Sequence, residues 1–139
     1  MGTVYRARDL FLGRTVALKV HRKRPNEQGL RRFLQEARAA QSLSHPNLAA
    51  TYDAGSEGEH YYLAMELVSG TSLAAIVKGG PLPWPDALAV GLQIGAGLAK
   101  AHHTGVMHRD LKPANIMLGR EGIVKLVDFG LAKRIEAID

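Results

Sequence analysis

The fold of this 139-residue chain is decided by HRDLKPAN at residues 108–115, which is followed by DFG at residues 128–130. The first stretch gathers a carboxylate, an ammonium group and an amide in a short segment. Upstream of it the apolar pattern predicts a long helix, and downstream two short apolar runs, 116–118 and 123–127, predict a β-hairpin. The polar side chains are therefore predicted to lie in a loop between a helix and a hairpin.

The helix upstream of this loop is predicted to begin at Trp84-Pro85-Asp86 and to end at Gly105 in a left-handed cap. Its apolar stripe is expected to consist of Leu88, Leu92, Leu98 and Ala101. Glycine inside a helix costs roughly 1 kcal/mol relative to alanine, so interior glycines indicate close packing against a neighbour. The glycines in question are Gly91, Gly95 and Gly97. A short helix is expected at residues 73–78.

The N-terminal half has a different pattern, rich in β-strand residues. Runs at residues 3–7 and 16–20 predict a hairpin whose turn contains Gly13. Helical spacing of apolar residues predicts a helix over about residues 27–43, with Glu36 near its apolar face. Two further strands are expected at residues 48–53 and 60–67, divided by a turn at residues 55–58. The change of pattern at residues 68–72 indicates a domain boundary.

Composition excludes several classes of protein. Cysteine is absent, so disulfide frameworks, thiolate zinc sites and cysteine nucleophiles are excluded. No apolar stretch is long enough to span a bilayer, and a cytoplasmic location is expected. The net charge is +5, and residues 1–38 hold ten basic against three acidic residues. The run Arg22-Lys23-Arg24 could bind nucleic acid, but a solvated loop is the better interpretation, and no nucleic-acid partner is expected.

Several motifs occur together in one order along the chain. VALK at residues 16–19 precedes Glu36, and HRDLKPAN and DFG follow. In this combination the chain resembles the catalytic domain of eukaryotic-type serine/threonine protein kinases, a family that includes bacterial members. The resemblance implies a two-lobed α+β fold, here partial. Residues 1–68 would form the N-terminal lobe without its first strand. Residues 69–139 would begin the C-terminal lobe, through the catalytic loop and DFG, without the activation segment and the later helices.

The resemblance implies a role in phosphoryl transfer for four side chains. Lys19 would hold the α- and β-phosphates of ATP, and Glu36 would pair with Lys19. Asp110 would orient the acceptor hydroxyl and take its proton, while Lys112 would reach the γ-phosphate. A lysine two residues after the aspartate resembles the serine- and threonine-directed kinases. The implied partner is therefore a protein substrate with a Ser or Thr acceptor.

The resemblance also implies a site for ATP and Mg²⁺. Asn115 and Asp128 offer the oxygen ligands that Mg²⁺ prefers. The nucleotide would further contact residues that lie along the chain from the N-terminus to the hairpin: Gly2, Val4, Ala17, Met65, Glu66, Val68 and Met117. Met65 would be the gatekeeper, and the Glu66 carbonyl and Val68 amide would bind the adenine edge. His108 and Phe129 are expected to have structural roles.

The chain departs from the family pattern at both ends. A kinase glycine-rich loop reads GxGxxGxV, of which only Gly2 and Val4 are present, and the sequence stops nine residues after Gly130. Two further hypotheses therefore stand beside an active kinase. One is a truncated, catalytically incompetent fragment that acts at most as a nucleotide-binding or docking module. The other is a nucleic-acid binder, supported only by the N-terminal basic excess.

Overall fold

The computed structural model describes residues 2–22 and 25–128. These residues form two compact units. The first unit consists of residues 2–42 and 50–67, and the second of residues 43–49 and 68–128. Each unit has its own antiparallel β-sheet and at least one helix. The α+β class predicted from the sequence is therefore confirmed.

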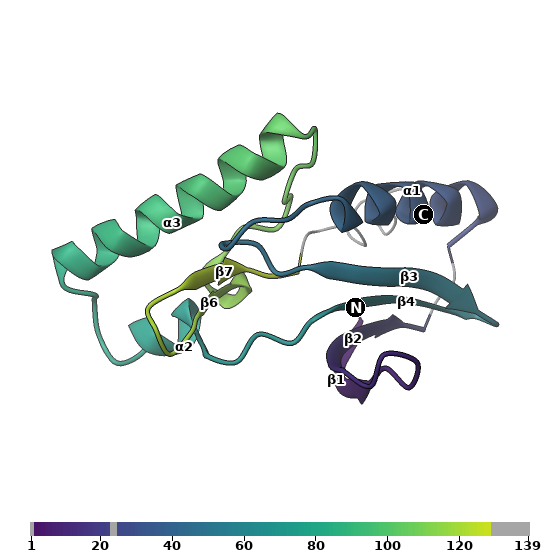
Figure 1. Cartoon of the computed structure of the whole chain (residues 1–139), viewed down its shortest axis with the longest axis horizontal. Helices are drawn as coiled ribbons and strands as arrows, with labels where there is room; N and C mark the ends of the chain where they lie inside the picture. Colours follow the sequence, from purple (N-terminus) through teal and green to yellow (C-terminus); the bar gives the residue numbers. More distant parts are fainter. Residues whose placement is uncertain (1, 23–24, 129–139) are drawn as a thin grey trace. The chain divides into compact units, whose positions relative to one another are not determined.

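The first unit is a four-stranded antiparallel sheet with one helix (Figure 1). The sheet has the order β1-β2-β4-β3. Its strands are β1 (Thr3–Arg8), β2 (Thr15–His21), β3 (Thr51–Glu57) and β4 (His60–Glu66). The predicted hairpin of β1 and β2 is confirmed. Gly13, at φ +68°, adopts the left-handed conformation that its turn requires.

Helix α1 (Glu27–Gln41) covers one face of this sheet. The Asn26 side chain caps it by accepting a hydrogen bond from the Gly29 amide at 2.8 Å. Phe33, which is almost fully buried, contacts the Tyr61 ring edge-on with centroids 5.1 Å apart. Tyr61 in turn stacks on His21 at 4.4 Å. These apolar and aromatic contacts form the core between helix and sheet.

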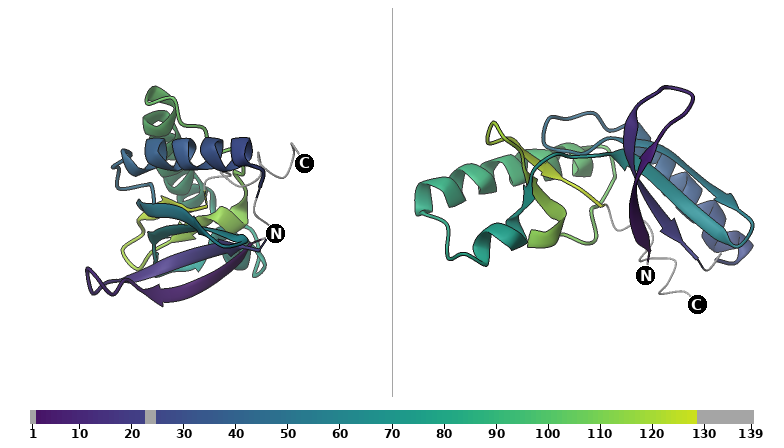
Figure 2. Two further views of the ribbon diagram at one scale, coloured as in Figure 1. Left: turned by 90° about the vertical axis from the view of Figure 1, so that its right-hand side faces the viewer. Right: turned by 90° about the horizontal axis from the view of Figure 1, so that it is seen from below.

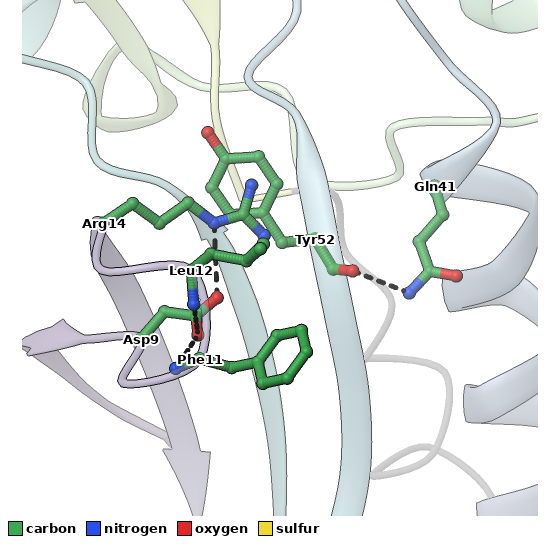
Figure 3. A network of polar contacts seen from close by, with 6 residues as sticks. All are labelled: Asp9, Phe11, Leu12, Arg14, Gln41 and Tyr52. Atoms are coloured by element: carbon green, nitrogen blue, oxygen red, sulfur yellow. Dashed lines mark hydrogen bonds and ion pairs between the residues drawn. The ribbon is translucent and has the colours of Figure 1, made fainter.

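The loop between β1 and β2 extends beyond the ends of its strands (Figure 2). The Asp9 carboxylate organises it by accepting hydrogen bonds from the Phe11 and Leu12 amides and from Arg14 (Figure 3). These bonds, the Leu12 amide above all, hold the pKa of Asp9 below its usual value. The Arg14 guanidinium also lies 3.6 Å from the centre of the Tyr52 ring. The loop therefore has a defined conformation although the Phe11 side chain is 94% exposed.

The predicted strand at residues 48–53 was placed too early in the chain, since β3 begins at Thr51. The preceding residues pair elsewhere: Leu48 forms a parallel bridge with Leu126, and the Ala49 amide donates to the Leu126 carbonyl at 2.9 Å. The predicted turn at residues 55–58 was likewise too early. The strand continues to Glu57, and the turn follows at Gly58, where φ is +57°.

The second unit contains a three-stranded sheet of order β5-β6-β7 and helices that flank it (Figure 1). Its elements are β5 (Thr71–Ser72), α2 (Leu73–Val77), α3 (Trp84–His103), the 3₁₀ turn η1 (Pro113–Asn115), β6 (Ile116–Leu118) and β7 (Val124–Leu126). The predicted short helix, long helix and second hairpin are thus confirmed. Gly105, at φ +79°, follows α3 in the predicted left-handed conformation.

The buried face of α3 agrees with the predicted stripe only in part, since Ala101 is buried as predicted. Leu88 and Leu92 are 54% and 67% exposed, whereas the buried residues are Val90, Gly97 and Ala101. Small residues are buried because the helix lies close to residues 47–48: a Cβ at Gly97 would stand 3.0 Å from the Asn47 carbonyl oxygen. Close packing was therefore predicted correctly at Gly97 only. At Gly91 and Gly95 an added Cβ would meet nothing within 4 Å among the described residues.

Candidate active site

The loop between α3 and η1 is anchored by His108, whose side chain is only 2% exposed. Its Nε2 lies 2.9 Å from the Val127 carbonyl oxygen, and its Nδ1 accepts from the Asp110 amide at 3.3 Å. A carbonyl can only accept and an amide N–H can only donate, so these partners specify the neutral Nε2–H tautomer. Burial lowers the pKa of His108, outweighing the opposite effects of the Val127 carbonyl, Asp128 and Asp110.

Asp110, Lys112 and Asn115 meet in this loop. The Asn115 Nδ2 donates to the Asp110 carbonyl oxygen at 2.9 Å and to its carboxylate Oδ2 at 3.2 Å. The Lys112 Nζ lies 3.7 Å from the same Oδ2. The Asp110 side chain is 12% exposed and that of Lys112 is 51% exposed. The carboxylate is therefore oriented by an amide on one side and neutralised by an ammonium group that still reaches solvent.

Asp128 follows β7 and is connected to the same loop through Val127. The Val127 amide donates to the Asn115 carbonyl at 2.9 Å, and its carbonyl lies against His108. Asp128 has φ +56° and Arg109 has φ +62°, and they are the only described residues other than glycine with positive φ. This conformation costs an L-residue about 1–3 kcal/mol and persists where the surroundings enforce it, as at functional sites.

The donor atoms here fit a magnesium ion. Because the Asn115 Nδ2 donates to Asp110, the amide orientation is set, and its other atom, Oδ1, is an oxygen of the kind that binds a metal. Asp128 supplies a carboxylate. Magnesium in proteins is commonly held by one or two such oxygens, together with water and substrate phosphates. The two side chains thus offer oxygen atoms of the kind that magnesium binds.

In the first unit, four predicted nucleotide-binding residues share one face of the sheet. Lys19 on β2 pairs directly with Val4 on β1 and with Leu63 on β4, and Ala17 pairs with Met65. Directly paired residues point to the same face, as do residues two apart on one strand. Val4, Ala17, Lys19 and Met65 therefore project from a single face. Ala17 and Met65 are buried on it.

Glu36 lies on the helix that covers this face. Phe33 contacts Tyr61, which shares the face of Lys19 because it precedes Leu63 on β4 by two residues. Glu36 is three residues after Phe33 and so neighbours it on the helix surface. Glu36 is half-buried. The fold thus brings the predicted partner of Lys19 to the sheet face that carries the lysine.

The remaining predicted site residues lie before β1, at the end of β4 and on β6. Gly2 precedes β1, and a Cβ there would lie 2.7 Å from the His21 ring, so packing by itself already favours glycine. Glu66 ends β4, where its amide and its Oε2 bond the Ala50 carbonyl and amide. Val68 follows that strand, and Met117 on β6 pairs with Ser72 and Lys125. Phe129 and Gly130 lie outside the described residues.

Sequence reasoning missed two side chains that hold β7. The Asn47 Nδ2 donates to the Val124 carbonyl, and the Gln93 Oε1 accepts from the Val124 amide. Val124 is at the end of β7 that is farther from Asp128. Gln93 carried a signal, because it is a polar side chain within the otherwise apolar stretch of α3. Asn47 follows a proline in a segment that is typical of a loop.

Comparisons with known proteins all indicate one family. The protein kinase domain model matches residues 1–138. The serine/threonine-protein kinase PknL of Mycobacterium tuberculosis is 46% identical over 138 residues, which cover 97% of this chain and 35% of PknL. PrkC of Bacillus subtilis, also a serine/threonine-protein kinase, is 41% identical over 140 residues, covering 99% of this chain and 22% of PrkC.

The structural comparison agrees. A crystal structure of Rad53 residues 1–466 in complex with AMP-PNP superimposes with a TM-score of 0.82 at 33% identity, covering 94% of this chain and 35% of the Rad53 chain in that structure. The chain therefore spans about a third or less of each of these proteins. Among the described residues, no helix has both the length and the apolar character needed to cross a membrane.

Proposed function

The chain belongs to the protein kinase family, and from this premise we propose that it carries the phosphoryl-transfer residues of a serine/threonine protein kinase. The observation that carries the proposal is the arrangement of Asp110, Lys112 and Asn115, in which an amide and an ammonium group hold one carboxylate. Kinase chemistry consists mainly of positioning and of balancing phosphate charge, and this arrangement supplies both.

In the proposed reaction, a Ser or Thr hydroxyl of a protein substrate attacks the γ-phosphorus of ATP. A new O–P bond forms, the bond from that phosphorus to the β,γ-bridging oxygen breaks, and ADP leaves. Asp110 accepts the hydroxyl proton, for which its orientation by Asn115 is suited. Lys112, whose ammonium group reaches solvent, neutralises charge on the transferred group.

The proposal assigns the binding of the nucleotide to the residues of the sheet face and to the oxygen-bearing side chains described above. Lys19, positioned by Glu36, would bind the α- and β-phosphates. The adenine would contact apolar and backbone groups: Gly2, Val4, Ala17, Met65, Glu66, Val68 and Met117. Asn115 and Asp128 would hold Mg²⁺, which when bound offsets phosphate charge. The AMP-PNP named for the Rad53 structure supports a nucleoside triphosphate as the ligand.

The names of the relatives support a protein Ser or Thr as the phosphoryl acceptor. PknL and PrkC are serine/threonine-protein kinases, which favours a protein Ser or Thr as acceptor over a small molecule. Under this proposal the first unit corresponds to the N-terminal lobe and the second to the start of the C-terminal lobe. The dependence on ATP favours a cytoplasmic site of action.

The test is a transfer assay with the chain, radiolabelled ATP, Mg²⁺ and a generic acceptor such as casein. We expect label on Ser or Thr, and a loss of about 10²–10⁴-fold in Asp110→Asn, the range for a positioned proton acceptor. Lys19→Met should also lose transfer. Exposed matched controls are Asp86→Asn and Lys100→Met, which should retain it.

Two outcomes contradict the proposal. Transfer that survives Asp110→Asn would show that another group accepts the proton. Magnesium-dependent ATP binding without any transfer would select the alternative, a nucleotide-binding module that does not phosphorylate. The latter is separated from a folding defect by the circular dichroism spectrum of the same sample.

A further inference from the structure

Two side-chain amides, Asn47 and Gln93, form a hydrogen-bonded cluster against β7, beside which α3 runs (Figure 1). The Asn47 Nδ2 donates to the Gln93 Oε1 at 2.9 Å and to the Val124 carbonyl at 2.8 Å. The Gln93 Oε1 also accepts from the Val124 amide at 2.8 Å, and its Nε2 donates to the Gly122 carbonyl at 2.9 Å. We call Asn47 and Gln93 the amide pair.

The amide pair completes one edge of β7. The other edge pairs with β6. Alternate residues of a strand direct their backbone groups to opposite edges, so Val124 and Leu126 need partners away from β6. Val124 finds them in the amide pair, and Leu126 finds them in the Asn47 carbonyl and the Ala49 amide, both at 2.9 Å. Both polar groups of both residues are thus satisfied, and the strand is held from two sides.

The position of β7 determines where the chain enters Asp128. Only Val127 separates the two, and it is held by the Asn115 carbonyl and by His108. Asp128 itself has an unfavourable backbone conformation, at φ +56°. A strained residue keeps its place only while its neighbours are fixed. The amide pair fixes the start of β7 at Val124, and residues of the candidate active site fix Val127 directly after the end of the strand.

We infer that Asn47 and Gln93 are positioning residues, which act through β7 to hold Asp128 in the geometry that binds magnesium. This inference rests on the proposed function, because it assigns the pair to the metal-binding role proposed for Asp128. The pair carries no charge and contacts neither Asp128 nor Asn115 in any bond described above. Its effect is therefore geometric. A misplacement of about 1 Å can cost 10²-fold in a reaction that depends on orientation.

The test measures the Mg²⁺ concentration at which AMP-PNP binding by the chain is half-maximal. Gln93→Leu removes all three bonds of the glutamine at similar volume, and we expect this midpoint to rise about tenfold, the low end for side chains that orient metal ligands. Gln93→Glu keeps oxygens that can accept from Val124 and Asn47, so its midpoint should lie nearer the wild-type value. The variants are compared at a temperature where circular dichroism shows all of them equally folded.

Gln41→Leu is the matched control. Gln41 is also a helical glutamine that donates to a strand carbonyl, that of Tyr52 at 3.1 Å, but this strand does not lead to Asp128. Its midpoint should equal that of the wild type. A general loss of folding would lower the amount of nucleotide bound at saturation in any variant, whereas at equal folding only a displaced metal ligand shifts the midpoint. Equal midpoints for Gln93→Leu and Gln41→Leu overturn the inference.

Hydrogen exchange gives a second readout that needs no nucleotide. In Gln93→Leu the amides of residues 124–128 should exchange faster than in the wild type, and in Gln41→Leu they should not. If wild-type chain binds no Mg²⁺ with AMP-PNP, the proposed function fails, and the exchange rates then decide whether the pair holds the segment. Unchanged exchange in Gln93→Leu overturns the inference in either case.

Discussion

His108 shows how a single buried side chain connects two segments of the second unit. Its two ring nitrogens bond the backbone at Asp110 and at Val127, which lie on either side of the β6–β7 hairpin. A buried polar group that is fully paired is stabilising, and one that loses a partner is costly. The neutral ring satisfies both partners, whereas protonation at Nδ1 would place a second donor against the Asp110 amide.

The stability of the chain should therefore depend on the charge of His108. Burial lowers its pKa in the folded state below the usual value of 6.5, so the unfolded chain binds the proton more readily. The contribution of neutral His108 is complete above about pH 6.5 and is lost as the pH falls toward the folded-state pKa. We expect the free energy of unfolding, from urea titrations, to fall between about pH 7 and pH 5 less steeply in His108→Gln than in wild type.

His102→Gln is the control for this prediction, since His102 is exposed at the end of α3. Its pH profile should match that of the wild type. Equal slopes in His108→Gln and wild type would mean that the lowered pKa of His108 makes no measurable contribution.

At the scale of elements, α3 shows that helix packing depends on the smallest side chains. Gly97 and Ala101 are buried, while Trp84, Leu88 and Leu92 are exposed. Residues 47–48 approach the helix so closely that only glycine fits at position 97 without a shift of the neighbouring backbone. This approach also brings Asn47 within hydrogen-bond distance of Gln93.

Alanine substitutions at two glycines of α3 should have opposite effects. Gly95→Ala places its methyl group in open space among the described residues, so we expect a gain of up to about 1 kcal/mol from helix propensity. Gly97→Ala presses against the Asn47 carbonyl at 3.0 Å, and we expect a net loss of stability. Urea unfolding followed by circular dichroism measures both. A Gly97→Ala chain as stable as Gly95→Ala would show that residues 47–48 move away without cost.

At the scale of the whole molecule, the residues proposed to bind nucleotide are distributed over both compact units. Lys19 projects from a sheet face of the first unit, and Asn115 and Asp128 belong to the second. Each unit orders its own set by local and cross-strand hydrogen bonds.

A ligand that binds only the folded chain raises its free energy of unfolding. At a concentration of 100 times the dissociation constant the gain is about 2.7 kcal/mol. We expect AMP-PNP with Mg²⁺ to stabilise the wild type by this amount, and to stabilise Lys19→Met and Asp128→Asn much less. The exposed-site variants Lys100→Met and Asp86→Asn should respond as the wild type does. Equal stabilisation after removal of Mg²⁺ with EDTA would contradict the metal-binding role of Asn115 and Asp128.

The sequence alone was sufficient for the family and for most of the elements, although it misplaced β3 and did not predict β5. Alternation, helical spacing and turn glycines predicted the β1–β2 and β6–β7 hairpins and the helices α1, α2 and α3, because these patterns reflect hydrogen bonds and burial within short segments. The motifs VALK, HRDLKPAN and DFG pointed to the kinase family, which the comparisons confirmed. The contact between Asp110 and Asn115 is also local in the sequence, since only five positions separate the two residues.

What only the tertiary structure decided depends on contacts between distant segments. Asn47 bonds Gln93 and Val124, which are 46 and 77 positions away, and no local pattern encodes such partners. The backbone of residues 47–49 pairs with β7 instead of extending the larger sheet, and β3 therefore begins only at Thr51. The same segment also determined which face of α3 is buried, since close approach of a neighbouring backbone favours Gly97 over the larger Leu88 and Leu92.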